Sequence, residues 1–85
     1  MHIERTVRDF LRTSFYLPRD RELPGAASLL ESGIVDSTGV LELIGFLEKT
    51  FGIRVADDEI LPENLDSVDR ITSFVDRKLH ERAAE

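Results

Sequence analysis

Apolar side chains recur three and four residues apart in three segments of this chain, residues 3–15, 37–51 and 67–80. This spacing places them on one face of a helix, so it predicts three amphipathic helices. The second helix is the most apolar, because Leu41 and Phe46 widen its apolar arc beyond what burial of one face requires. Part of this helix is therefore expected to face a partner. Its main apolar face consists of Val40, Leu43, Ile44, Leu47 and Phe51.

Residues with strong capping preferences mark the ends of these helices. Asp36 and Ser37 are both good N-caps for the second helix, and Gly52 suits a left-handed C-cap. Asp66 or Ser67 can cap the last helix in the same way.

A long loop, residues 16–35, separates the first two helices. Pro18 and Pro24-Gly25 end the first helix, and Gly33 permits a turn before the second. A connection of this length in a small domain is usually functional or held by its own apolar side chains. The side chains that can hold it are Leu23, Leu29, Leu30, Ile34 and Val35.

The segment between the second and last helices contains no complete strand, because residues 53–55 are too few and have no partner. A short helix is expected to start near Asp57, with Pro62 near its end or at the start of another turn. The fold class is therefore all-α: a small four-helix bundle with three main helices, one short helix and a long first loop. Residues 1–85 form one domain, and residues 81–85 are expected to fray.

Composition narrows the function classes. The 85 residues include no cysteine, which excludes disulfides, cysteine nucleophiles and cysteine-ligated zinc. The net charge of −6 argues against binding to nucleic acid or to an anionic membrane. With no signal peptide and no apolar run longer than residues 43–47, the expectation is a monomer in the cytoplasm.

The negative charge is concentrated in the middle of the chain. Residues 31–66 contain two basic and nine acidic side chains, whereas the segments before and after are close to neutral. The acidic cluster Asp57, Asp58 and Glu59 is interpreted as the start of a helix rather than as a metal site. His2 and His80 lie near opposite ends and are expected to be solvated, so the sequence predicts neither a catalytic residue nor a metal site.

Ser37 is the residue with the clearest chemical potential. It follows Asp36 and opens the most apolar helix, where free N–H groups and the helix dipole favour a phosphate. No histidine lies near it in sequence, so a hydrolase triad is not supported. The fitting role is that of an acceptor, to which another enzyme attaches a group through phosphate. The alternative is that Ser37 is only a helix cap.

Gly33-Ile34-Val35-Asp36-Ser37, then Val40-Leu41-Glu42-Leu43 and the run from Leu47 to Ile53, resemble the acyl and peptidyl carrier protein family over nearly the whole chain. The resemblance implies that Ser37 carries 4′-phosphopantetheine, transferred from coenzyme A by a phosphopantetheinyl transferase, with Asp36 supporting recognition. The thiol of this arm would hold an acyl or aminoacyl group as a thioester. The carrier would catalyse nothing itself. A loading ligase or transferase and a downstream synthase or transferase would be its partners, in fatty acid, polyketide, nonribosomal peptide or another specialised biosynthesis.

The resemblance also implies a docking surface for basic partner enzymes. Glu42 and Glu48 match acidic docking positions of the family, with Asp57 and Asp58 as second choices. Thr38 stands where the family usually has leucine, and Gly39, Gly45 and Lys49 are further departures, which leaves the pathway open. The expected docking residues are Thr38, Leu41, Glu42, Gly45 and Glu48. The competing hypothesis is an unmodified helical interaction module, in which Leu41 and Phe46 form the docking patch and Ser37 is a plain cap.

Overall fold

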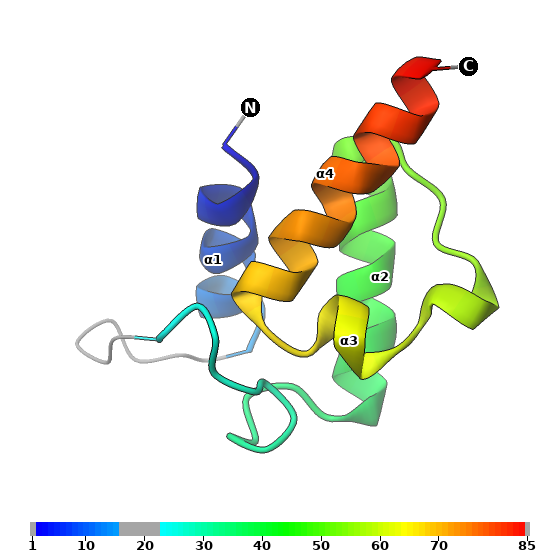
Figure 1. Ribbon diagram of the computed structural model, residues 1–85. Coiled ribbons are helices and arrows are strands. Elements are labelled where there is room, and N and C mark those ends of the chain that lie inside the picture. Colours follow the sequence, from blue (N-terminus) through cyan, green and yellow to red (C-terminus); the bar gives the residue numbers. More distant parts are fainter. Residues whose placement is uncertain (1, 16–22, 85) are drawn as a thin grey trace.

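The computed structural model describes residues 2–15 and 23–84, with side chains up to residue 81 (Figure 1). These residues form helices and turns and contain no strand, which confirms the predicted all-α bundle. A single 3-10 turn, η1, spans Asp57–Glu59. The α-helices are α1 (Ile3–Ser14), α2 (Ser37–Phe51), α3 (Pro62–Leu65) and α4 (Val68–Ala84).

Helix α4 organises the core. It packs against each of the other three helices, and Figure 1 shows it crossing α2 and running beside α1. Val68, Ile71 and Val75 of α4 are completely buried, because their spacing keeps them on the inner face. The other side chains of the core with almost no exposed surface are Val7, Leu11, Leu29, Leu43, Leu47 and Phe74.

The ends of α2 are set by Asp36 and Gly52. Oδ1 of Asp36 accepts the Gly39 N–H at 2.7 Å, so Asp36 is the N-cap and Ser37 is the first helical residue. The alternative that Ser37 serves only as a cap is therefore wrong, because the Asp36 side chain already fills that position. Gly52 ends the helix at φ 67°, as predicted, in a conformation that glycine adopts without strain.

Helix α4 begins after Ser67, whose Oγ accepts the Arg70 N–H at 3.1 Å. It continues to Ala84, and fraying of the chain from residue 81 stays a prediction. Alanine has the highest helix propensity, and two alanines extend this last turn.

The loop before α2 lies against the junction of α3 and α4. Residues 16–22 of the predicted loop lie outside the described residues. In the remainder, Leu23, Leu29 and Val35 are buried as predicted and Ile34 is half-buried. Leu30 is 42% exposed, so the expectation that it helps to hold the loop is wrong, because the turn that buries Leu29 directs its neighbour outward. Gly33 has φ 78°, which fits the predicted turn.

The segment between α2 and α4 contains one 3-10 turn and one short α-helix. The short helix expected at Asp57 is the single turn η1. Pro62 is the first residue of α3, where a missing N–H costs nothing, so the second of its two predicted placements is confirmed.

An aromatic cluster joins α1 to α2. The rings of Phe10 and Phe46 stack at a centroid distance of 3.9 Å, and Phe15 and Phe51 contact this pair edge-on. A Cβ atom at Gly39 would lie 2.6 Å from the Phe15 ring, so a glycine is needed for this close approach. The packing of Phe15 therefore accounts for the absence of a side chain at residue 39.

Candidate functional site

Ser37 lies at the start of α2, exposed to solvent. Its hydroxyl makes no hydrogen bond to any residue that the structure describes, because Asp36 caps the helix instead. The first N–H groups of a helix have no acceptor within the helix, so partial positive charge remains beside this hydroxyl. The site can therefore accept a phosphate-linked group without breaking an existing bond.

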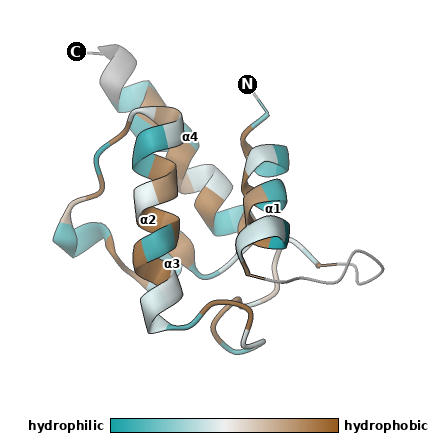
Figure 2. Ribbon diagram, turned by 180° about the vertical axis from the view of Figure 1, so that it is seen from behind, coloured by the Kyte–Doolittle hydropathy of each residue, from teal (hydrophilic) through white to brown (hydrophobic). Residues whose placement is uncertain are grey.

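An apolar groove with a volume of about 340 Å³ opens beside Ser37. One wall comes from the loop, one from the first turns of α2, and one from the segment that enters α3. Figure 2 shows apolar positions in these three segments at the same end of the molecule. The side chains that form the walls are Leu29, Leu30, Val35, Val40, Leu41 and Leu65, with Ile60, Leu61 and Pro62 at the third wall.

Three leucines at this groove are exposed. Leu41 has 66% of its surface in contact with solvent, Leu30 has 42% and Leu61 has 39%. A cluster of exposed leucines next to a groove is a common mark of a binding surface. The sequence predicted an accessible Leu41, but it missed Leu30 and Leu61, because they approach Leu41 only after the loop and α3 have packed.

Four of the five expected docking residues share an exposed strip on α2. Thr38, Leu41, Glu42 and Gly45 are all exposed, and their spacing of three and four residues places them on the same face of the helix. At Gly45 a Cβ atom would meet nothing within 4 Å, so this part of the helix surface is open backbone.

Glu48, the fifth expected docking residue, is half-buried. Its Oε2 accepts the Val55 N–H at 2.9 Å, which ties α2 to the segment that follows it. Glu48 therefore has a structural role, and its carboxylate is less available to a partner than that of Glu42.

The acidic residues of the middle segment divide into two groups. Four carboxylates accept hydrogen bonds within the fold, those of Asp36, Glu48, Glu59 and Asp66. The other five are exposed and accept none from the described residues: Glu31, Glu42, Asp57, Asp58 and Glu63. Only this second group is fully free to attract a basic partner.

Glu59 has a lowered pKa. The Ala56 N–H donates to it at 3.0 Å and the Lys78 ammonium lies 2.9 Å away. These two donors hold the pKa of Glu59 below its ordinary value of 4.5, with the Ala56 bond as the larger cause. Glu59 therefore braces η1 against α4, and its charge is already balanced.

Phe46 does not belong to an exposed patch. It is half-buried and stacks on Phe10, so the interaction-module hypothesis is wrong about this residue. Phe46 faces α1, where its ring stacks on Phe10.

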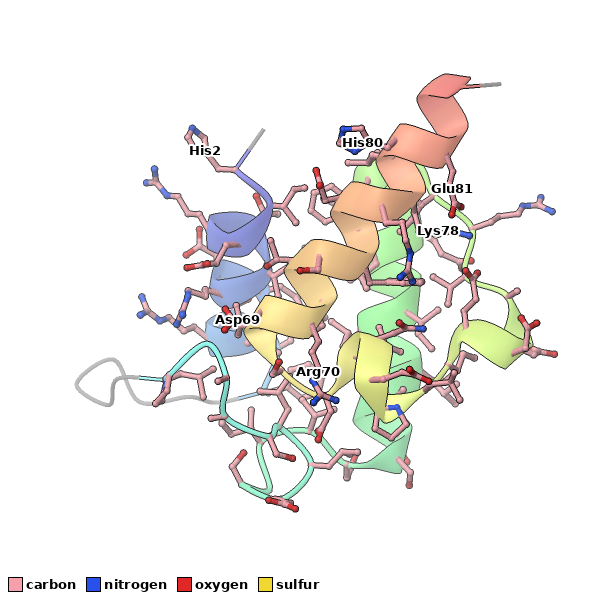
Figure 3. All side chains as sticks on the ribbon, in the orientation of Figure 1. His2, Asp69, Arg70, Lys78, His80 and Glu81 are labelled. Carbon is pink, nitrogen blue, oxygen red and sulfur yellow. The ribbon has the colours of Figure 1, made fainter. Side chains whose placement is uncertain are left out.

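His2 and His80 are both exposed, as predicted, and Figure 3 shows His2 just before α1 and His80 on α4. His80 Nδ1 lies 2.7 Å from the Asp76 carbonyl oxygen, within its own helix. Neither histidine lines the groove beside Ser37.

A scan against protein-family models and a search of curated proteins each gave no match to this chain. Among the helices of the described residues, none combines the length and the apolar character needed to cross a bilayer.

Proposed function

We propose that this protein is a discrete acyl or aminoacyl carrier protein in which Ser37 accepts 4′-phosphopantetheine. The observation that carries the proposal is the free, exposed hydroxyl of Ser37 at the start of α2, beside an apolar groove. The Ser37 Oγ would form a bond to phosphorus as the pyrophosphate bond of coenzyme A breaks. Adenosine bisphosphate would leave, and the transferase would take the hydroxyl proton.

The surroundings of Ser37 suit a phosphodiester. The helix start offers N–H donors and a favourable dipole, while Asp36 keeps its carboxylate on the Gly39 N–H. The arm would supply a thiol, which a chain without cysteine lacks.

The groove gives the arm and its cargo a place to rest. Because Ser37 lines the groove, an apolar chain attached there could turn back against Val40 and Leu41. Each buried methylene would stabilise this arrangement by about 0.8 kcal/mol. Cargo held in this way would be shielded from water between partners.

Docking on partner enzymes would combine charge and apolar contact. Glu42 and the exposed acids of η1 would steer basic surfaces toward Ser37, and Leu41 would provide the apolar contact. Steering of this kind weakens as salt rises.

The test is a loading assay with coenzyme A, magnesium and a broad-specificity phosphopantetheinyl transferase, followed by intact mass measurement. We expect one added phosphopantetheine on the wild-type chain and none on Ser37→Ala. Ser73→Ala is the matched control, because Ser73 is exposed on α4 and should leave loading unchanged. An unmodified wild-type chain would refute the carrier proposal.

The exposed leucines also favour a second candidate, an unmodified interaction module that takes a partner's apolar side chain into the groove. This candidate predicts no loading at Ser37. It also predicts that Leu41→Ala weakens partner binding while Ser37→Ala does not.

A further inference from the structure

Asp66 joins two walls of the groove beside Ser37. It follows the last residue of α3, and both of its carboxylate oxygens accept hydrogen bonds from the loop. Oδ2 accepts the Ser28 hydroxyl at 2.6 Å, and Oδ1 accepts the Leu30 N–H at 3.0 Å. We call this pair of bonds the Asp66 clasp.

Backbone bonds reinforce the same junction. The Asp66 carbonyl oxygen accepts the Leu29 N–H at 2.8 Å, and the Gly25 carbonyl accepts the Asp69 N–H at 3.0 Å. Ser28 Oγ also accepts the Glu31 N–H, which tightens the turn that carries Leu29 and Leu30. The loop wall is thus tied to α3 and α4 by side chain and backbone together.

The clasp has two effects on the groove. It fixes the separation of Leu30 on the loop from Leu65 on α3, because Asp66 is bonded to one and adjacent in sequence to the other. It also occupies both carboxylate oxygens of Asp66, which lines the groove, so that this charge is hydrogen-bonded rather than turned toward an apolar occupant.

We propose that Asp66 is a positioning residue that sets the separation of the loop wall from α3. This separation sets the volume of the groove, and so the length of the longest straight apolar chain that the groove accommodates. The identity of the natural occupant as attached cargo rests on the proposed function. The role of Asp66 in limiting chain length does not require Ser37 to be loaded, and it can be measured on the unmodified protein.

The experiment titrates the full, unmodified chain with straight-chain alcohols of increasing length and follows the methyl NMR signals of Val40 and Leu41. In the wild-type protein, affinity should rise about fourfold for each methylene that becomes buried. The rise should stop at the length that fills the groove. In Asp66→Ala this limit should move to chains about two carbons longer, because the loop wall loses the two side-chain bonds that help to hold it.

Matched variants separate positioning from general destabilisation. Asp9→Ala removes the same charge from an exposed residue of α1 outside the groove, and it should keep the wild-type limit. Asp66→Asn retains an oxygen for the Leu30 N–H, so it should restore the limit at least in part. Ser28→Ala removes one bond of the clasp and should shift the limit in the same direction by a smaller amount, even if Asp66→Ala does not fold.

The outcomes are distinct from those of the loading assay. An unchanged limit in both clasp variants, an equal shift in Asp9→Ala, or no alcohol binding at Val40 and Leu41 would each overturn the role of Asp66. Failure of Ser37 to accept phosphopantetheine would overturn the carrier proposal and leave the chain-length result standing.

Discussion

Two glycines of α2 should respond in opposite directions to the same substitution. Gly45 is exposed in the helix interior and an added Cβ would meet nothing within 4 Å. Alanine is favoured over glycine in a helix by about 1 kcal/mol, so Gly45→Ala should stabilise the protein by roughly that amount. For a domain of this size this corresponds to a rise in Tm of about 4–8 °C.

Gly39→Ala adds the same methyl group in the same helix, but its Cβ would lie 2.6 Å from the Phe15 ring and 3.2 Å from Asp36 Oδ1. Phe15 cannot withdraw freely, because it packs edge-on against Phe10 at 5.6 Å. Overpacking of this kind costs about 1–3 kcal/mol. The gain in helix propensity is similar in the two variants and largely cancels. Gly39→Ala should therefore be less stable than Gly45→Ala by the overpacking cost, about 1–3 kcal/mol.

The assay is urea unfolding of both variants and the wild type, followed by far-UV circular dichroism. A double-mutant cycle with Phe15→Ala gives the control, because removing the ring should relieve the cost at Gly39 and leave Gly45→Ala unaffected. Equal stabilisation at both glycines would refute the contact between Phe15 and α2. Destabilisation by Gly45→Ala would refute the open surface of the helix at that residue.

Three further predictions concern the carboxylates around the site. Asp36→Ala should cost about 1 kcal/mol in urea unfolding because it removes the cap, whereas Ser37→Ala should change stability by only a few tenths; equal costs would contradict the capping geometry. Because the pKa of Glu59 is lowered in the fold, its contribution to stability is present above about pH 4.5 and lost as the pH falls further, so the stability difference between wild type and Glu59→Gln should narrow in acid. A stability difference that stays constant with pH would count against the contacts of Glu59 with the Ala56 N–H and Lys78. Glu42→Lys should slow loading by the transferase most at low salt while leaving the unfolding midpoint nearly unchanged, and a rate independent of salt would argue against steering.

Much of this molecule could be predicted from the sequence alone. Helix periodicity located the three main helices, because apolar side chains must share a face to be buried. The left-handed turn at Gly52 and the turn at Gly33 followed from the conformational freedom of glycine. The position of Ser37 at a helix start was also predictable, since it depends only on the local pattern from Gly33 to Val40.

Contacts between distant segments could not be predicted in this way. The sequence allowed Asp36 or Ser37 as the cap of α2, and the structure selects Asp36. Asp66 was a candidate cap for α4, but its carboxylate instead binds the loop nearly forty residues earlier, and Ser67 caps the helix. Each choice depends on which acceptors and donors come within about 3 Å after packing.

The acidic residues of segment 31–66 also separate what the sequence determines from what only packing decides. The sequence alone determined how many carboxylates the segment contains and that they surround Ser37 along the chain. Only the tertiary structure decided that four of them hold the fold while Glu42 and four others remain exposed. It also decided that Leu30, Leu41 and Leu61 meet at one groove, because side chains far apart in sequence become neighbours only when the loop, α2 and α3 pack around a common core.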